Sequence, residues 1–125
     1  MLKITIPLPP TTKKNSQRIV VSRSTGKPFI LPSEQYKDYE AKARWFIPKQ
    51  KTPIDYPVNV KCLFYMPTRR KCDLTNLLEA IDDILVNAGV LADDNYTIIQ
   101  SHDGSRVYYD KENPRTEIYI EEVKE

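Results

Sequence analysis

The chain has 125 residues, of which 40% are hydrophobic and 29% are charged, and this composition is that of one folded domain over residues 1–125. It excludes an intrinsically disordered chain, and no apolar run approaches the ~20 residues of a membrane-spanning helix. The formal net charge of +2 is too small to establish nucleic-acid binding by itself. Since no charged leader precedes an apolar segment, we expect a cytoplasmic protein with no membrane partner.

The first third of the chain predicts a strand, a loop region and a helix. Residues 2–8 alternate apolar and polar side chains, and the prolines that follow end this strand. The basic stretch 11–32 predicts a loop or a loose hairpin with a turn at 24–28. Ser33 is a suitable N-cap for a helix that runs to about Ile47. The apolar stripe of that helix consists of Tyr36, Tyr39, Ala43 and Phe46.

The remaining elements complete an α+β pattern. Residues 58–66 alternate as a strand, and apolar residues at helical spacing over 73–87 predict the central helix, which ends at Ala88-Gly89. Residues 96–101 and 106–109 are strand-like, and the Asp103-Gly104 pair between them indicates a bulge in one long strand in preference to a hairpin turn. A last strand covers 116–120. We therefore expect a single small domain with a mixed sheet of about four strands packed with two main helices.

Cysteine and histidine are too few for a zinc site. Cys62 and Cys72 form no C-x-x-C pair, and we interpret both as reduced packing residues. His102 is the single histidine, and its expected role is structural or a phosphate contact.

Hydrolysis of a phosphodiester at neutral pH calls for a divalent metal, which carboxylate oxygens bind. Asp73 stands at the start of the central helix, and Asp93 and Asp94 follow its end. Taken singly, Asp73 is more typical of a helix N-cap than of a metal ligand, and Asp93-Asp94-Asn95 is more typical of a turn. Asp83 lies ~15 Å along the helix from Asp73, so it cannot share one metal with that residue, and a surface pair or a contact across a dimer is its expected role.

Basic residues gather in the first third and just before the central helix. Such cations make sequence-independent phosphate contacts, although single clusters are as often ordinary solvated charges. The DNA-binding residues that we expect are Lys13, Lys14, Asn15, Arg18, Arg69, Arg70 and Lys71.

One combination of residues is more specific than the acids alone. It consists of Arg69-Arg70-Lys71-Cys72-Asp73-Leu74-Thr75-Asn76-Leu77 and then Ala88-Gly89-Val90-Leu91-Ala92-Asp93-Asp94. This block resembles the RusA family of Holliday-junction resolvases. The N-terminal strand that ends in Pro-x-Pro-Pro, followed by Asn15, is also similar to the beginning of that family, so the likeness spans essentially the whole chain.

The resemblance implies a Mg²⁺-dependent homodimer, with Mn²⁺ as a substitute, that cuts four-way DNA junctions by paired nicks in recombination and repair, often in phages or prophages. Transferred by position, Asp73 is the first essential acid, and Asp94 is the acid after the helix with Asp93 as its neighbour; these three would bind the metal. A two-fold dimer would place one site on each of two symmetrical strands.

Two positions depart from the family pattern. Thr75 replaces a second acid and Glu79 replaces a lysine, and the two share a helical stripe because they are four residues apart. Either Glu79 supplies the missing carboxylate while Thr75 orients water at the metal, or Glu79 is a solvated position and two aspartates suffice. The same departures keep open an inactive junction-binding or regulatory module. A nuclease selective for flaps or forks is a further alternative.

Overall fold

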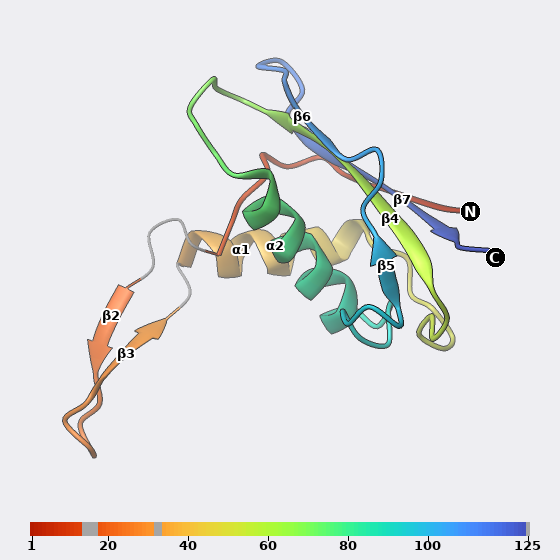
Figure 1. Cartoon of the computed structure of the whole chain (residues 1–125). Helices are drawn as coiled ribbons and strands as arrows, with labels where there is room; N and C mark the ends of the chain where they lie inside the picture. Colours follow the sequence, from red (N-terminus) through yellow and green to blue (C-terminus); the bar gives the residue numbers. More distant parts are fainter. Residues whose placement is uncertain (14–17, 32–33, 125) are drawn as a thin grey trace.

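The computed structural model describes residues 1–13, 18–31 and 34–124, with the backbone alone for 18–20 and 29–31. These residues form a mixed five-stranded sheet, a separate two-stranded hairpin and two α-helices (Figure 1). The expected single-domain α+β fold is confirmed. The sheet has one strand more than expected because its last edge is divided into two short strands.

The sheet contains β1 (Leu2–Ile6), β7 (Arg115–Glu122) and β4 (Val58–Met66) in that order, followed by the edge strands β5 (Ile99–Ser101) and β6 (Arg106–Tyr109). The β4 prediction is confirmed at both ends, whereas β1 stops two residues earlier than expected, at Ile6. Cys62 lies opposite Ile118, and Ile118 lies opposite Ile4. All three are buried, so one face of the sheet forms the core.

Two helices supply the other half of the core. α2 (Leu74–Asn87) buries Leu77, Ile81 and Leu85, as the helical spacing predicted. α1 (Glu34–Ala43) buries Tyr36, Tyr39 and Ala43. Its α-helical part ends four residues before the predicted Ile47, and the chain continues as a single 3₁₀ turn, η1 (Arg44–Phe46). Phe46 leaves the predicted stripe there and is 44% exposed. The predicted N-cap Ser33 lies outside the described residues.

α2 ends at Ala88-Gly89, as predicted. Gly89 has φ of 79°, a backbone conformation that glycine adopts without strain. The Val90 N–H donates to the Leu85 carbonyl at 2.9 Å, and the Gly89 N–H donates to the Val86 carbonyl at 3.0 Å. This pair of hydrogen bonds is a Schellman motif, and it turns the chain toward the segment that carries Asp93 and Asp94.

The sheet edge after α2 is one strand with an interruption. Both β5 and β6 pair with β4 in parallel, so the bulge interpretation is confirmed and the hairpin alternative is wrong. At the interruption, side chains take the place of the backbone hydrogen bonds to β4. The Cys62 N–H donates to Ser105 Oγ at 3.0 Å, and His102 Nδ1 donates to the Val60 carbonyl at 2.9 Å. The strand begins at Ile99, three residues after the predicted start, because residues 96–98 form a turn.

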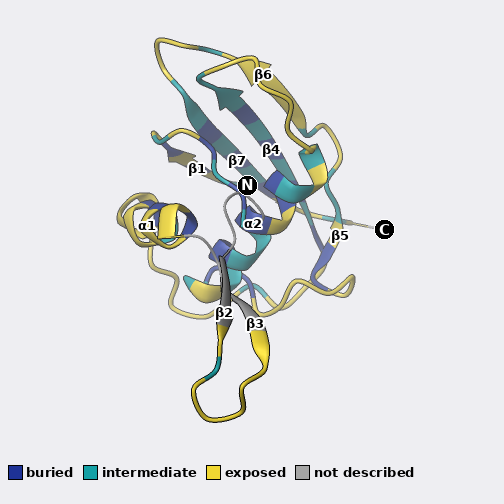
Figure 2. Ribbon diagram, turned by 90° about the vertical axis from the view of Figure 1, so that its left-hand side faces the viewer, coloured by how far each residue is buried: buried dark blue, intermediate teal, exposed yellow. Residues whose placement is uncertain are grey.

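β6 leaves its outer edge uncovered. It pairs with β4 only, and all four of its residues are exposed, as the colouring of Figure 2 shows. Tyr108 stacks on Tyr65 with ring centroids 5.1 Å apart, and the Arg115 guanidinium covers the Tyr65 ring at 3.7 Å. These side chains stand on the face of the sheet opposite the helices.

The basic stretch near the N-terminus contains a hairpin. β2 (Arg18–Val21) and β3 (Pro28–Leu31) pair antiparallel and project away from the sheet (Figure 1). The last predicted strand is longer than expected, since β7 extends from Arg115 to Glu122. Within the described ranges, every helix is too short and too polar to span a bilayer.

Candidate active site

Asp73 lies in a small open cavity at the beginning of α2. The cavity has a volume of about 190 Å³ and is lined by Thr12, Lys71, Cys72, Asp73 and Asn76. Asp73 occupies the N-cap position, but its carboxylate makes no capping hydrogen bond to the helix backbone. Instead Asp73 Oδ2 accepts a hydrogen bond of 3.3 Å from the Asn76 amide. The N-cap position expected for Asp73 is confirmed, but the exposed carboxylate does not cap the helix and remains available to a ligand.

Cations lie next to this cavity. Lys71 lines it directly, and Arg70 lines a second hollow that shares Lys71 and Cys72 with the first. The Arg69 guanidinium covers the Tyr109 ring at 4.2 Å, which holds Arg69 against β6. The segment thus places positive charge beside a carboxylate and beside the free N–H groups of the first turn of α2, an arrangement that favours phosphate.

Asp93 and Asp94 lie in the loop between α2 and β5. The Asp94 N–H donates to Asp93 Oδ1 at 2.7 Å, and this bond lowers the pKa of Asp93 below its ordinary value. The pKa of Asp94 is raised, first by partial desolvation and then by the neighbouring carboxylates of Asp93 and Asp83. A bound cation would relieve the repulsion among these neighbouring carboxylates.

The two ends of α2 keep these acids apart. The helix has 14 residues, or roughly 21 Å, with Asp73 at its first end and the Asp93-Asp94 loop beyond its last. Figure 1 shows the segments before and after α2 at opposite ends of the helix. Among the described residues, no group of three His, Cys, Asp or Glu side chains could hold a metal ion. Within one chain, α2 therefore lies between Asp73 and the loop that carries Asp94.

A stripe of side chains connects the two ends. Thr75, Glu79 and Asp83 follow one another at intervals of four residues along α2. Thr75 and Glu79 are exposed, whereas Asp83 forms an ion pair with Lys13, whose ammonium also lies over the Tyr36 ring at 5.8 Å. Asp83 therefore forms a surface pair, one of its expected roles. Lys14 and Asn15 lie outside the described residues, and only the backbone of Arg18 is described.

His102 and Asp82 form a pair that the sequence did not reveal. His102 Nε2 lies 3.0 Å from Asp82 Oδ2, while Nδ1 holds the Val60 carbonyl. The hydrogen bond to Asp82 raises the pKa of His102, and burial raises the pKa of Asp82. This pair fixes the edge-strand interruption onto α2, in agreement with the structural role expected for His102. One feature of the sequence could have indicated this pair: Asp82 follows Ile81 at the border of the apolar stripe of α2, where an acid is partly buried and needs a partner.

The two cysteines differ in position. Cys62 is buried in β4, as expected, and burial raises the pKa of its thiol. Cys72 is exposed in the cavity of Asp73, so the prediction that it packs in the core is wrong. The residue precedes the N-cap and follows three cations, in a segment that is exposed from Arg69 to Asp73.

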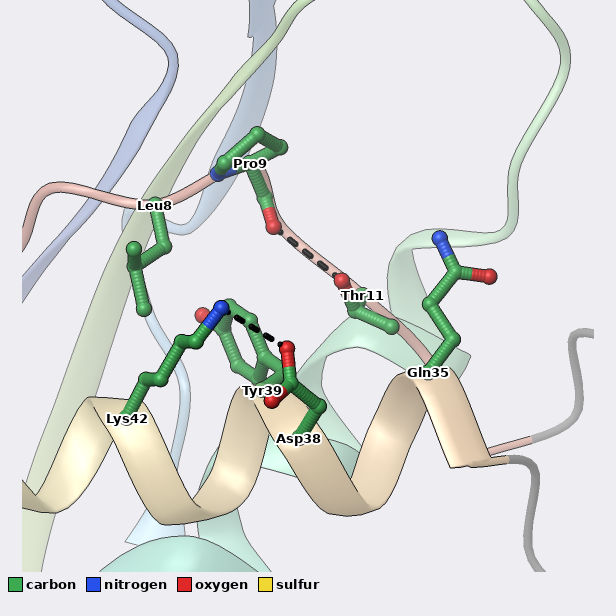
Figure 3. Close-up of a pocket in the computed structure, with 7 residues that line it drawn as sticks. All are labelled: Leu8, Pro9, Thr11, Gln35, Asp38, Tyr39 and Lys42. Atoms are coloured by element: carbon green, nitrogen blue, oxygen red, sulfur yellow. Dashed lines mark hydrogen bonds and ion pairs between the residues drawn. The ribbon is translucent and has the colours of Figure 1, made fainter.

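A further hollow lies between the N-terminal segment and α1 (Figure 3). It has a volume of about 190 Å³ and includes Asp38 and Lys42, whose charged groups are 3.0 Å apart. Figure 3 shows that Thr11 donates to the Pro9 carbonyl at its rim, at 3.1 Å. Since these polar groups already satisfy one another, this hollow offers less to a substrate than the cavity of Asp73.

A carboxylate beside cations, at the start of a helix packed on a mixed sheet, is typical of enzymes that act on nucleic-acid phosphodiesters. Comparison with known proteins gives the family. The family described as Endodeoxyribonuclease RusA matches residues 7–121. A protein of Aquifex aeolicus (strain VF5), Crossover junction endodeoxyribonuclease RusA, is 34% identical over 89 residues, which cover 70% of this chain and 68% of that protein. The chain belongs to the RusA family of endodeoxyribonucleases.

Proposed function

We propose that this endonuclease resolves four-way DNA junctions by paired symmetrical nicks and requires a divalent metal, Mg²⁺ or Mn²⁺. The observation that carries the proposal is the exposed Asp73 carboxylate in a cavity flanked by Lys71 and Arg70. The name of the Aquifex relative, a crossover junction endodeoxyribonuclease, supports the same substrate.

The side chains in the cavity of Asp73 fit a hard divalent cation. Asp73 and the amide oxygen of Asn76 are oxygen donors, and the cavity is open, so phosphate oxygens and water could complete the coordination that Mg²⁺ prefers. Asp94, with Asp93 beside it, would supply the second set of carboxylate oxygens. When bound, the cation supplies positive charge against the phosphate oxygens and promotes ionisation of water.

The chain's own residues would bind and orient the substrate. Lys71 and Arg70 would contact phosphates beside the segment that leads into α2. The free N–H groups at the start of α2 add partial positive charge near Asp73. Asn76 holds the Asp73 carboxylate in one orientation through its 3.3 Å hydrogen bond. Junction selectivity would come from the spacing of two such surfaces in a homodimer.

The separation of Asp73 from Asp94 favours a site shared between protomers. If both acids act on one phosphodiester, the roughly 21 Å length of α2 favours Asp94 of the partner subunit as the acid that approaches Asp73. A two-fold dimer would create two such shared sites, one for each nick.

The decisive test is cleavage of a synthetic four-way junction with Mg²⁺, Mn²⁺ or EDTA, beside flap, fork and linear duplex substrates. We expect symmetrical metal-dependent nicks in the junction alone. Asp73→Asn and Asp94→Asn should each lower the cutting rate by about 10³-fold or more, the equivalent of several kcal/mol. Asp38→Asn removes a carboxylate that is paired with Lys42 on α1, and this control should cut normally.

Other outcomes separate the alternatives. Tight junction binding without cleavage in any metal would identify an inactive binding module. Equal rates on flaps, forks and junctions would identify a broader structure-selective nuclease.

A further inference from the structure

A hollow of about 410 Å³ lies beside the loop that carries Asp94. Pro57, Tyr96, Thr97 and Gln100 line it. Tyr96 is 82% exposed, the most exposed tyrosine among the described residues. Covering a large aromatic ring that is exposed to water is favourable, because it removes apolar surface from the solvent.

The walls of this hollow are fixed by hydrogen bonds. The Thr97 N–H donates to Asn95 Oδ1 at 2.9 Å, and the Ile98 and Ile99 N–H groups donate to the Asn95 carbonyl. On the opposite wall, the Pro57 carbonyl accepts from Val123 at 3.0 Å. The Val58 N–H joins the two walls through the Ile98 carbonyl at 2.8 Å. Tyr96 is therefore presented on a built turn.

The chemistry of the lining indicates a flat and uncharged ligand. The rings of Pro57 and Tyr96 are apolar surfaces. The Gln100 amide makes no hydrogen bond to the described residues, so its donor and its acceptor are both available. No cation among the described residues lines the hollow, and the carboxylates of Asp93 and Asp94 lie within the same loop, so an anion would be repelled. Nucleobases combine a planar aromatic face with an edge of donors and acceptors.

We propose that this hollow binds an unpaired nucleobase from the DNA strand that is cut at Asp94. The proposal rests on the proposed junction-resolving function and adds a base-binding subsite to it. Tyr96 would stack on the base, and Gln100 would contact its edge. Tyr96 is two positions after Asp94, so their Cα atoms are at most about 7 Å apart and the base belongs to a nucleotide adjoining the phosphate at Asp94. Only a base outside the helical stack can reach Tyr96, as at a branch point.

The test uses the full chain and four-way junctions that carry the fluorescent base 2-aminopurine at each branch-point position in turn. Binding is measured in EDTA, so that no strand is cut. We expect the wild-type protein to quench one position by stacking. Tyr96→Ala should abolish that quenching and weaken junction binding by about 5- to 150-fold, the range observed for loss of a stacking aromatic. Tyr96→Phe keeps the ring and should retain both effects.

Two further variants sharpen the result. Trp45→Ala removes a side chain that is 87% exposed on η1, and as the matched control it should leave the quenching unchanged. Gln100→Ala should keep the quenching but broaden the set of sequences that are cut in Mg²⁺, because the base edge is no longer read.

Each alternative has its own signature. Unchanged quenching and affinity in Tyr96→Ala would overturn the proposal, as would an equal loss in Trp45→Ala. A Tyr96→Ala protein with normal DNA binding but a changed sedimentation coefficient would assign the hollow to a protein interface and overturn it too. Wild-type protein that quenches the base but cuts no junction would refute the resolvase function while leaving the base site intact. Normal junction cleavage with no 2-aminopurine position quenched would refute the base site while leaving the resolvase function intact.

Discussion

The two ends of α2 carry acids in opposite surroundings. At the N-terminal end Asp73 stands among cations, with Lys71 in its own cavity and Arg70 in the next. At the C-terminal end Asp94 stands among acids. Its pKa is raised mainly by partial desolvation and further by the carboxylates of Asp93 and Asp83. The first end can attract phosphate by itself, whereas the second end needs a cation before a phosphate can approach. One helix thus separates a DNA-attracting region from a metal-attracting region.

The strongest test of this separation mixes two inactive proteins. If Asp73 of one protomer acts with Asp94 of the partner, a dimer of one Asp73→Asn chain and one Asp94→Asn chain retains one intact site. After subunit exchange about half of the dimers are mixed, and each mixed dimer has one intact site of two. We therefore expect roughly a quarter of the wild-type nicking activity, with one strand cut per junction. Gel analysis of singly and doubly labelled junctions measures it.

The same mixture distinguishes the alternative. If each site lies within one protomer, every site in the mixed dimer lacks one acid, and no nick returns. Mixing two preparations of the Asp73→Asn variant provides the matched control.

Much of the fold follows from local patterns, and these the sequence predicted well. The alternation over 58–66 and the helical spacing over 73–87 each reflect a choice between two faces of one element, which neighbouring residues determine. Gly89 ends α2 for an equally local reason, its positive φ. The family resemblance identified the chain as an endodeoxyribonuclease, and the acids that it assigns to the site stay a prediction.

Long-range contacts were beyond the sequence. His102 meets Asp82 only because the edge strand is interrupted opposite Val60. The resemblance assigned Asp73 and Asp94 to one site, but a position in a motif carries no distance, and the structure places the segments that carry them at opposite ends of α2. Tyr96 looked like the first residue of a strand because nothing in its neighbours shows that the Asn95 side chain folds back on Thr97.

A second prediction concerns the stripe that connects the two regions. Glu79 lies ~9 Å along the axis from Asp73, and helical side chains lean toward the N-terminus, so its carboxylate can reach toward the cavity of Asp73. We expect Glu79→Ala to raise the Mg²⁺ concentration for half-maximal cutting by about tenfold. Glu79→Gln, which keeps the shape, should behave similarly. An unchanged Mg²⁺ titration would show that the aspartates suffice without it.

A smaller effect should come from the cations at the N-terminal end of α2. Lys71→Ala and Arg70→Ala should each reduce the salt dependence of junction binding by about one unit of slope in log K against log salt, since each removes one phosphate contact. Anisotropy titrations at several salt concentrations measure this slope. Lys42→Ala provides the control, because Lys42 is paired with Asp38 on α1. Equal slopes in all proteins would place the DNA elsewhere.

The smallest effect tests how the middle of α2 is fixed to the sheet. The pKa of His102 is raised above 6.5, so its bond to Asp82 stabilises the fold fully below that pH and is lost as pH rises through the raised value. Asp82, with its pKa raised above 3.8, also binds protons more tightly when folded, so stability changes in the same direction. The thermal midpoint should fall by a few degrees between pH 6 and pH 8. His102→Gln should flatten this dependence in a melting series, and a slope that persists in that variant would assign it to other groups.

The open edge of β6 has a consequence for the protein at high concentration. An uncovered strand offers its outer N–H and C=O groups to any other chain in an extended conformation. Arg106, Val107, Tyr108 and Tyr109 include a single charge and no proline, so little in the strand opposes such addition. Solubility in a concentrated solution therefore depends on whether this edge is covered, and a lysine in place of Val107 should delay precipitation without touching either end of α2.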